Sequence, residues 1–248
     1  MDAIEKFYQA VSDTLTQVMD HQRANITTAA GWMADSVEAG KIFHVFGTGG
    51  HSNMAAIEMN HRAGNLVPAN CILDPGLSCE HGATRWCEKI PGYAQQVLRY
   101  YRVQPGDLML QVNAYGINAV TIDTAMECRR LGVKTIAITS PSLSRQIPAD
   151  TPARHPSGQN LCDLADLVID SYTPYGEAMV DLPNVAFKVS PASSIINLFI
   201  LDAMNAKACE ILNQRGITPP VWISGNIPGG NEANQQNLDA YWGRLRHL

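Results

Sequence analysis

Apolar side chains recur every three, four or seven positions over the first 38 residues, which contain no proline and no glycine before Gly31. That spacing places the apolar residues along one face of a helix. It predicts either one long helix or two shorter helices that break near residues 20–24 and fold over their own core. At about 1.5 Å per residue, a single helix would be longer than a small domain is wide. Part of it would then pack against another subunit.

Beyond residue 38, short apolar runs alternate with stretches of helical periodicity. We expect strands at residues 41–46, 66–73, 107–112, 133–138 and 167–169, with a further candidate at 185–189. We expect helices at residues 52–63, 92–101, 117–131 and 192–215, and a last one near Tyr241. Residues 75–91 should form a loop or short helices, and residues 141–160, which contain four prolines, should be irregular. Alternating strands and helices predict an α/β fold with a parallel sheet and right-handed crossovers.

The helix expected at 192–215 has an unusual distribution of apolar residues. They cover more than one face, which is typical of a helix buried centrally or at a subunit contact. Ser190 and Pro191 would begin this helix as its N-cap and its first residue.

Composition and charge narrow the class of protein. A chain of 248 residues suffices for one large domain or two small ones. The net charge of −5 without a basic block argues against nucleic acid as a partner. The most apolar run, residues 195–200, is far too short to span a membrane. The mixed polar N-terminus and six scattered cysteines without a CxxC pair predict a cytoplasmic protein with reduced thiols.

The strand expected at 41–46 leads directly into a glycine-rich loop that consists of Gly47, Thr48, Gly49, Gly50, His51 and Ser52. The mononucleotide signature GxxxxGK[ST] is absent. A dinucleotide fingerprint would need glycine where Ser52 stands, although Asp74 lies near the acidic position that it expects. The interpretation that we favour is a sugar-phosphate loop, in which backbone N–H groups, a helix start and Ser52 hold an anion without lysine. The alternative is a turn that only connects strand to helix.

Hydroxyl side chains follow other expected strands. Ligands of open parallel sheets bind at the carboxyl ends of the strands. Thr139 and Ser140 lie at such an end, and Ser193 and Ser194 lie at the opening of the helix 192–215. Together with the glycine-rich loop, they indicate a site for a polyol or a phosphate.

These segments resemble the SIS (sugar isomerase) domain family, related to phosphoheptose isomerase, and within it a subgroup of stand-alone bacterial sugar isomerase-domain proteins. The motifs that carry the resemblance run in order over residues 40–235 and are HVFGTGGHSNMAAIEMNHRAG, PGDLMLQVNAYGINAVTIDTAMECRRLGVKTIAITS, ARHPSGQNLCDLADLVID, PYGEA and TPPVWISGNIPGGNEAN. The resemblance implies a flavodoxin-like, three-layer α/β/α SIS domain with a five-stranded parallel sheet at residues 39–216. A helical extension at 1–38 would precede it, and a tail with a short helix at 217–248 would follow it.

Two departures from the subgroup bear on the substrate. Its second loop typically reads S-N-S-G-R-N, with serines that hold phosphate, and here that loop consists of Asn113, Ala114, Tyr115, Gly116, Ile117 and Asn118. The tail motif G-G-D-E-H-N has Asn231 and Ala233 in place of the acid and the histidine. Because amides and a Tyr ring suit neutral sugars, we expect a substrate whose anion is absent, different from phosphate or placed differently. The alternative is that Thr139, Ser140 and the backbone replace the lost serines.

Aldose–ketose isomerisation through an enediol needs a base and an acid. Glu58 and His61 are three residues apart on the helix expected at 52–63, with Arg62 beside them. Glu58 lies about where related isomerases place functional side chains. The alternative is that Glu58 and Arg62 form an ordinary surface pair four residues apart.

Further candidates for the chemistry lie in loops, where a scaffold often positions functional residues. Glu80 and His81 occupy the long loop, where related proteins have a similar pair in reversed order, and His155 lies in the proline-rich loop. Each is as well explained as a plain surface residue. Glu58, His61 and His81 could converge on a metal, but no spacing demands one, and we expect neither a metal nor a cofactor.

The residues and the resemblance together predict a sugar or sugar-phosphate aldose–ketose isomerase with a carboxylate base. The alternatives are a non-catalytic, regulatory sugar-phosphate-binding protein and a lyase or etherase for an amino-sugar phosphate. The expected partners are a small-molecule sugar and further copies of the chain, as a homodimer or higher homo-oligomer, without nucleic acid or membrane. The candidate catalytic residues are Glu58, Glu80, His81 and His155. The candidate ligand-binding residues are Gly47, Thr48, Gly49, Gly50, His51, Ser52, Arg62, Asn113, Tyr115, Asn118, Thr139 and Ser140.

Overall fold

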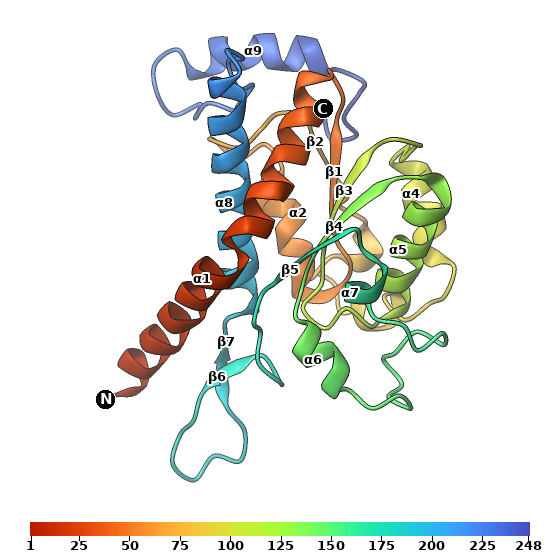
Figure 1. Cartoon of the computed structure of the whole chain (residues 1–248), viewed down its shortest axis with the longest axis vertical. Coiled ribbons are helices and arrows are strands. Elements are labelled where there is room, and N and C mark those ends of the chain that lie inside the picture. Colours follow the sequence, from red (N-terminus) through yellow and green to blue (C-terminus); the bar gives the residue numbers. More distant parts are fainter.

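Five apolar runs form one parallel sheet at the centre of the computed structural model, which describes residues 1–248 (Figure 1). The strands are β1 (Phe43–Gly47), β2 (Ala69–Cys71), β3 (Leu108–Val112), β4 (Lys134–Thr139) and β5 (Leu167–Asp170). Their order is β2-β1-β3-β4-β5, and every neighbouring pair is parallel. This flavodoxin-like order confirms the expected fold. The direction of winding reverses between β1 and β3, so the loops after these two strands diverge.

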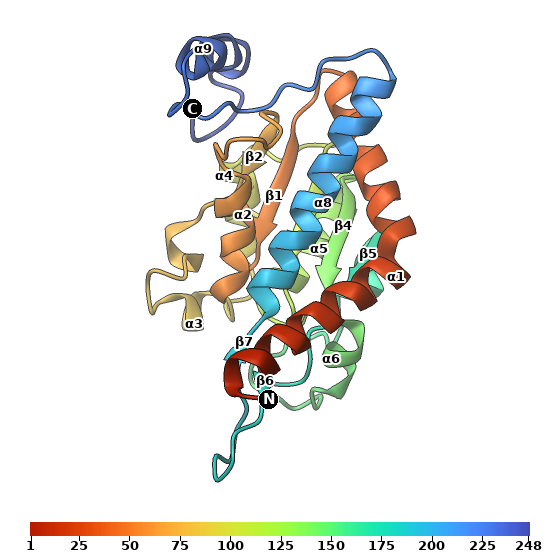
Figure 2. The same cartoon turned by 90° about the vertical axis from the view of Figure 1, so that its left-hand side faces the viewer.

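Helices cover both faces of the sheet, which explains why β1 and β3 are buried along their whole length. One face packs against α1 (Ala3–Glu38), α2 (Met54–Met59) and α8 (Ser193–Gln214), and the other against α4 (Tyr93–Tyr100) and α5 (Ala119–Leu131) (Figure 2). Alternate strand residues serve the two cores, with Phe43 in the first and Phe46 in the second. None of the helices combines the length and the apolarity that crossing a bilayer would require.

Smaller elements lie around these layers. They are the short helices α3 (Thr84–Cys87), α6 (Pro141–Gln146), α7 (Leu161–Leu164) and α9 (Gly230–Tyr241), the single 3-10 turns η1 (Gly50–Asn53) and η2 (Pro75–Leu77), and the antiparallel hairpin of β6 (Ala178–Val180) and β7 (Val189–Pro191). The hairpin and the short helices α3 and α6 lie toward the same end of the molecule as the carboxyl ends of the strands (Figure 2).

Ala3–Glu38 forms one unbroken helix, so the expectation of a single long helix is the correct one. A capping box begins it, because Asp2 accepts a hydrogen bond from the Glu5 N–H and Glu5 accepts one from the Asp2 N–H. Its C-terminal half packs on α8, whereas its N-terminal half passes beside the hairpin of β6 and β7 and exposes Ile4 and Tyr8 (Figure 2). The expected homo-oligomer stays a prediction, and light scattering that found a monomer at micromolar concentration would contradict it.

The helix expected at 52–63 is shorter than its sequence pattern indicates. It consists of η1 and α2 and ends at Met59, because Asn60 is extended and His61 has a φ of 53°. Glu58 and His61 therefore do not share a helical face. The strand expected at 66–73 is also shorter, because Leu66 bridges Val221 of the C-terminal tail before β2 begins.

Two further expectations are corrected around the hairpin. Ser190 and Pro191 do not begin α8, because Val189–Pro191 pairs with β6 and the helix starts at Ser193 after Ala192. The strand proposed at 185–189 is displaced to β7, outside the main sheet. The region 141–160 is not wholly irregular either, since Pro141 begins α6 at a position where a helix tolerates proline.

Candidate active site

A cavity of about 380 Å³ opens where the strand order reverses, at the carboxyl ends of β1 and β3. Open α/β sheets bind their ligands at such a reversal, and a cavity of this size suits a small molecule. Its walls come from the loop after β1, the residues after α3, the loop after β3, residues 147–153 and the start of α8. Five of its 18 lining residues are hydrophobic, so the cavity suits a ligand that has both polar groups and apolar faces.

The glycine-rich loop forms one wall of the cavity through Gly49, Gly50, His51 and Ser52. Gly47 lies beneath it, and a Cβ there would overlap the backbone of Ser52, so this turn closes too tightly for any other residue. Gly49 has a φ of 107°, which also favours glycine. One N–H group of the loop is already satisfied inside the protein, because Gly50 N donates to the Thr84 hydroxyl at 3.0 Å.

Thr48, Asn113 and Asn118 hold the two loops together. The carbonyl of Thr48 accepts hydrogen bonds from the amides of Asn113 at 3.0 Å and Asn118 at 3.1 Å. The amide oxygens accept from the backbone N–H groups of Gly116 and Thr121, each at 2.8 Å. Asn113 and Asn118 do line the cavity, but these bonds already occupy the amides that we expected to bind sugar hydroxyls.

Thr139 and Ser140 do not line the cavity, contrary to their expected role as ligand-binding hydroxyls. Both are fully buried. The Thr139 hydroxyl donates to the Ala114 carbonyl at 3.3 Å, and the Ser140 hydroxyl donates to the Thr173 carbonyl at 3.0 Å. They fix neighbouring loops from below, so they are in no position to replace the lost phosphate-binding serines.

Glu88 is the carboxylate that lies over the glycine-rich loop. Its Oε2 lies against Gly49, close to where a Cβ would stand, and lies 3.4 Å from the Asn118 amide nitrogen. The Glu88 carbonyl accepts from Val120 N at 3.0 Å, which ties the residue to the start of α5. The half-buried side chain forms no ion pair, and burial raises the pKa of its carboxyl, an effect that Lys89 only partly offsets.

A second carboxylate, Glu177, lies on the opposite side, at the start of α8. Its Oε2 accepts a hydrogen bond from the Ser193 hydroxyl at 2.7 Å. Tyr115 lies nearby, and its pKa is raised by burial first and then by the charge of Glu177. One turn further along α8, Asn197 lines the cavity with only 4% of its surface exposed, and its Oδ1 has no hydrogen-bond partner. The cavity therefore has two acidic walls.

The four candidate catalytic residues lie outside the cavity lining. Glu58 pairs with Arg62, whose Nε lies 3.0 Å from its Oε1, which is the surface pair that was the alternative interpretation. Glu80 and His81 are exposed. The His155 Nε2 lies 3.2 Å from Asp123 Oδ1, which anchors its loop to α5.

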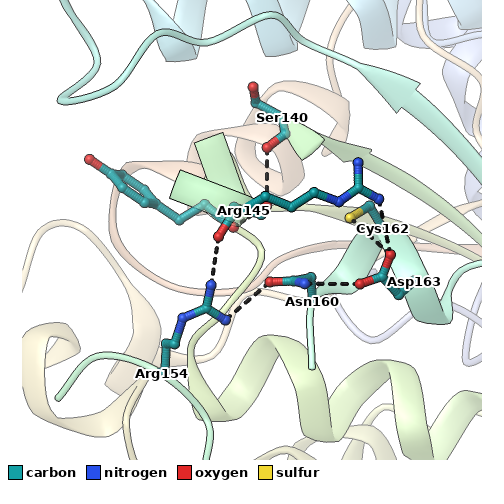
Figure 3. Close-up of polar contacts among 8 residues, drawn as sticks. Ser140, Arg145, Arg154, Asn160, Cys162 and Asp163 are labelled. Atoms are coloured by element: carbon teal, nitrogen blue, oxygen red, sulfur yellow. Dashed lines mark hydrogen bonds and ion pairs between the residues drawn. The ribbon is translucent and has the colours of Figure 1, made fainter. Parts of the chain in front are cut away.

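Arg154 holds the wall formed by residues 147–153 (Figure 3). Its guanidinium donates to the carbonyls of Ser144 at 2.6 Å and Ile147 at 3.0 Å, and to the Asn160 Oδ1 at 3.1 Å. The Asn160 amide then donates to Asp163 at 2.9 Å (Figure 3). A planar, forked cation suits this arrangement, because it satisfies several acceptors at once.

Three residues of the site, Glu88, Glu177 and Asn197, were not predicted from the sequence. Glu88 belongs to a region without periodicity, and Glu177 belongs to a loop whose path depends on the hairpin. Asn197 is a polar residue within a strongly apolar helix, which is the one signal that could have revealed it. The hydroxyls at the start of α8 were identified, and Ser193 and Ser194 do line the cavity.

Known proteins share the sequence and the fold of this chain. A family model described as SIS domain matches residues 6–140. The UPF0309 protein of Geobacillus kaustophilus (strain HTA426) is 34% identical over 98% of this chain and 95% of its own length. The UPF0309 protein of Streptomyces coelicolor is 34% identical over 97% of this chain and 95% of its own length.

Two solved structures show the same architecture. The phosphoheptose isomerase of Francisella tularensis has a TM-score of 0.54 at 17% identity and covers 85% of this chain and 100% of its own. The phosphoheptose isomerase of Neisseria gonorrhoeae has a TM-score of 0.55 at 12% identity and covers 84% of this chain and 97% of its own. At these identities the likeness shows the fold alone.

Proposed function

The chain belongs to the SIS-domain family, and we propose that it interconverts an aldose and a ketose in the cavity between β1 and β3, with Glu88 as the base. The observation that carries the proposal is the position of Glu88. It is a half-buried carboxylate in the cavity wall, without an ion-pair partner and with a raised pKa. Perturbed carboxylates in clefts are typical of acid–base sites.

The reaction needs one proton to move between neighbouring carbons. In the open-chain sugar, the Glu88 carboxylate takes the proton from C2, and the electron pair forms the enediol double bond as the C1 carbonyl oxygen gains a proton. The protonated Glu88 then returns its proton to C1, while the C2 oxygen loses its proton and becomes the ketone. One carboxyl group therefore serves as base and then as acid. The raised pKa makes the Glu88 carboxylate a stronger base than an ordinary carboxylate.

His51 is the proposed partner for the proton that moves between the two oxygens. It lines the cavity from the glycine-rich loop and is exposed at its edge. An imidazole can give and take protons near neutral pH. Ser52 and Ser194 also line the cavity, and in this proposal they bind the remaining sugar hydroxyls.

A panel of aldoses and their phosphate monoesters, followed by NMR for ketose formation, tests this proposal. For the substrate that is turned over, Glu88→Gln should lower kcat by about 10²-fold or more, because it keeps the shape and removes the basicity. Glu58→Gln is the matched control, since Glu58 lies outside the lining, and it should keep near-normal turnover. Binding without ketose formation across the panel would favour a binding protein instead, and normal turnover in Glu88→Gln would place the base elsewhere.

A further inference from the structure

The start of α8 is the natural place in this cavity for an anion. Ser193 and Ser194 of its first turn line the cavity, and the Ala192 before them provides no capping side chain. The first backbone N–H with an intrahelical acceptor is that of Ile196, which donates to Ala192 O at 3.1 Å. The earlier N–H groups of this 22-residue helix give its end a partial positive charge. A phosphate would therefore be expected here.

A carboxylate of the protein already occupies this position. The Glu177 Oε2 accepts from the Ser193 hydroxyl at 2.7 Å. The backbone of Glu177 has a φ of 64°, a conformation that non-glycine residues adopt at a cost. Its N–H donates to the Pro174 carbonyl at 2.9 Å, and this turn brings the side chain to the helix start.

The other charges of the cavity are also poorly suited to a phosphate. Among the lining residues, Glu88 is a second acid, Lys89 is the single lysine, and there is no arginine. The neighbouring Arg145 and Arg154 are engaged with Asp163 and with backbone carbonyls (Figure 3). A phosphate dianion would thus meet two carboxylates, and it would lack the guanidinium groups that bind phosphate most strongly.

Asn197 provides an independent indication of a ligand. It is 4% exposed, lines the cavity one turn after Ser193, and its Oδ1 has no partner. A buried amide oxygen without a donor is costly unless a ligand supplies one. A sugar hydroxyl both donates and accepts, whereas a fully ionised phosphate only accepts.

We infer that Glu177 is a specificity-determining residue that excludes phosphate from the start of α8, and that the hydroxyls of an unphosphorylated sugar bind there to Glu177 and Asn197. This inference rests on the proposed function for the identity of the ligand as a sugar. Beyond the proposed function, it specifies that the substrate is a neutral sugar and that Glu177 is the side chain that selects it.

Calorimetry with inorganic phosphate, a hexose and the phosphate monoester of that hexose tests the inference. Wild type should bind the hexose at least as tightly as the monoester. Glu177→Gln keeps an acceptor for Ser193 and removes the charge, so its affinity for inorganic phosphate should rise about tenfold or more. Asn197→Ala should weaken hexose binding and leave phosphate binding unchanged.

Two variants serve as controls. Asp181→Asn removes the same charge from the loop that follows β6, where Asp181 is exposed and pairs with Lys188, and it should bind phosphate as weakly as wild type. Glu177→Asp keeps the charge, and it should also bind phosphate weakly. A gain in either control equal to that of Glu177→Gln would overturn the inference. The inference would also be overturned if wild type bound the monoester a hundredfold more tightly than the hexose, a difference of about 2.7 kcal/mol in binding free energy.

These measurements record binding and not turnover. Failure of the proposed isomerase activity would appear as absent ketose formation with the same order of affinities. Failure of the inference would appear as a preference for phosphate in wild type, whether or not ketose forms.

Discussion

Two half-buried glutamates follow the glycine-rich loop along the chain, and their surroundings differ in the one respect that matters for chemistry. Glu58 on α2 and Glu88 after α3 are both half-buried, and each has a cationic residue close in sequence. The Nε of Arg62 lies 3.0 Å from Glu58. Lys89 makes no such pair with Glu88, and burial raises the pKa of the Glu88 carboxyl. Counter-ion geometry, and not nearness in sequence, therefore distinguishes the candidate base from a surface ion pair.

The largest expected effect comes from disrupting the turn of the glycine-rich loop, against which Glu88 packs. A Cβ at Gly47 would overlap the Ser52 backbone, so Gly47→Ala should lower the free energy of unfolding by at least about 3 kcal/mol. Gly31→Ala is the control, because nothing lies near its added Cβ within α1, and it should raise that free energy by about 0.5–1 kcal/mol. Urea denaturation measures both. Equal stability of the two variants would contradict the tight turn.

The next effect concerns the cavity wall that lies apart from both glutamates. Arg154→Ala removes the forked bonds to Ser144, Ile147 and Asn160, and it should cost about 2 kcal/mol of stability and raise KM. Arg145→Ala is the matched control in the same network (Figure 3), because its pair with Asp163 is exposed and should contribute less than about 1 kcal/mol. Urea denaturation measures the stability of both variants, and steady-state kinetics measures their KM. Similar losses in both variants would mean that Arg154 has no special role.

The smallest effects are changes in stability at neutral pH, and they are opposite in sign for substitution of the two glutamates. The raised pKa of Glu88 means that folding favours its protonated form, so its contribution to stability is present at acid pH and is lost as pH rises through the range above an ordinary glutamate's pKa. Glu88→Gln should therefore be at least as stable as wild type at neutral pH. Glu58→Gln loses a partly exposed ion pair and should be less stable by about 0–1 kcal/mol. Denaturation at neutral pH tests the signs, and a marked loss of stability in Glu88→Gln would contradict the assignment.

The same pKa shift affects activity. The ionised Glu88 is the proposed base, so kcat/KM should fall as pH decreases through its folded pKa, at a higher pH than for an ordinary glutamate. An acid limb at the usual glutamate pKa would argue against Glu88.

The sequence predicted the fold well, because the alternation of apolar runs with helical periodicity leaves few topologies for a parallel sheet. It also located the loop at 47–52, whose glycines mark a close approach of backbone segments. It failed for Thr139 and Ser140, since a place at the carboxyl end of a strand does not reveal whether a side chain points into the cleft or below it. Glu177 reaches the cavity through the tertiary packing of a loop beside the hairpin, which no local pattern encodes, and for Asn197 the only local signal was its polarity within an apolar helix.

The central claim, that Glu88 is the base, is tested most directly by proton exchange with solvent. The proton held on the Glu88 carboxyl exchanges with solvent in competition with its return to C1. Isomerisation in D₂O, followed by proton NMR, should therefore place solvent deuterium at C1. Wild type and Glu58→Gln should incorporate deuterium at similar rates. Glu88→Gln should incorporate it at least about 10²-fold more slowly. Exchange at the wild-type rate in Glu88→Gln, together with loss of exchange in Glu58→Gln, would contradict the account and return the base to α2.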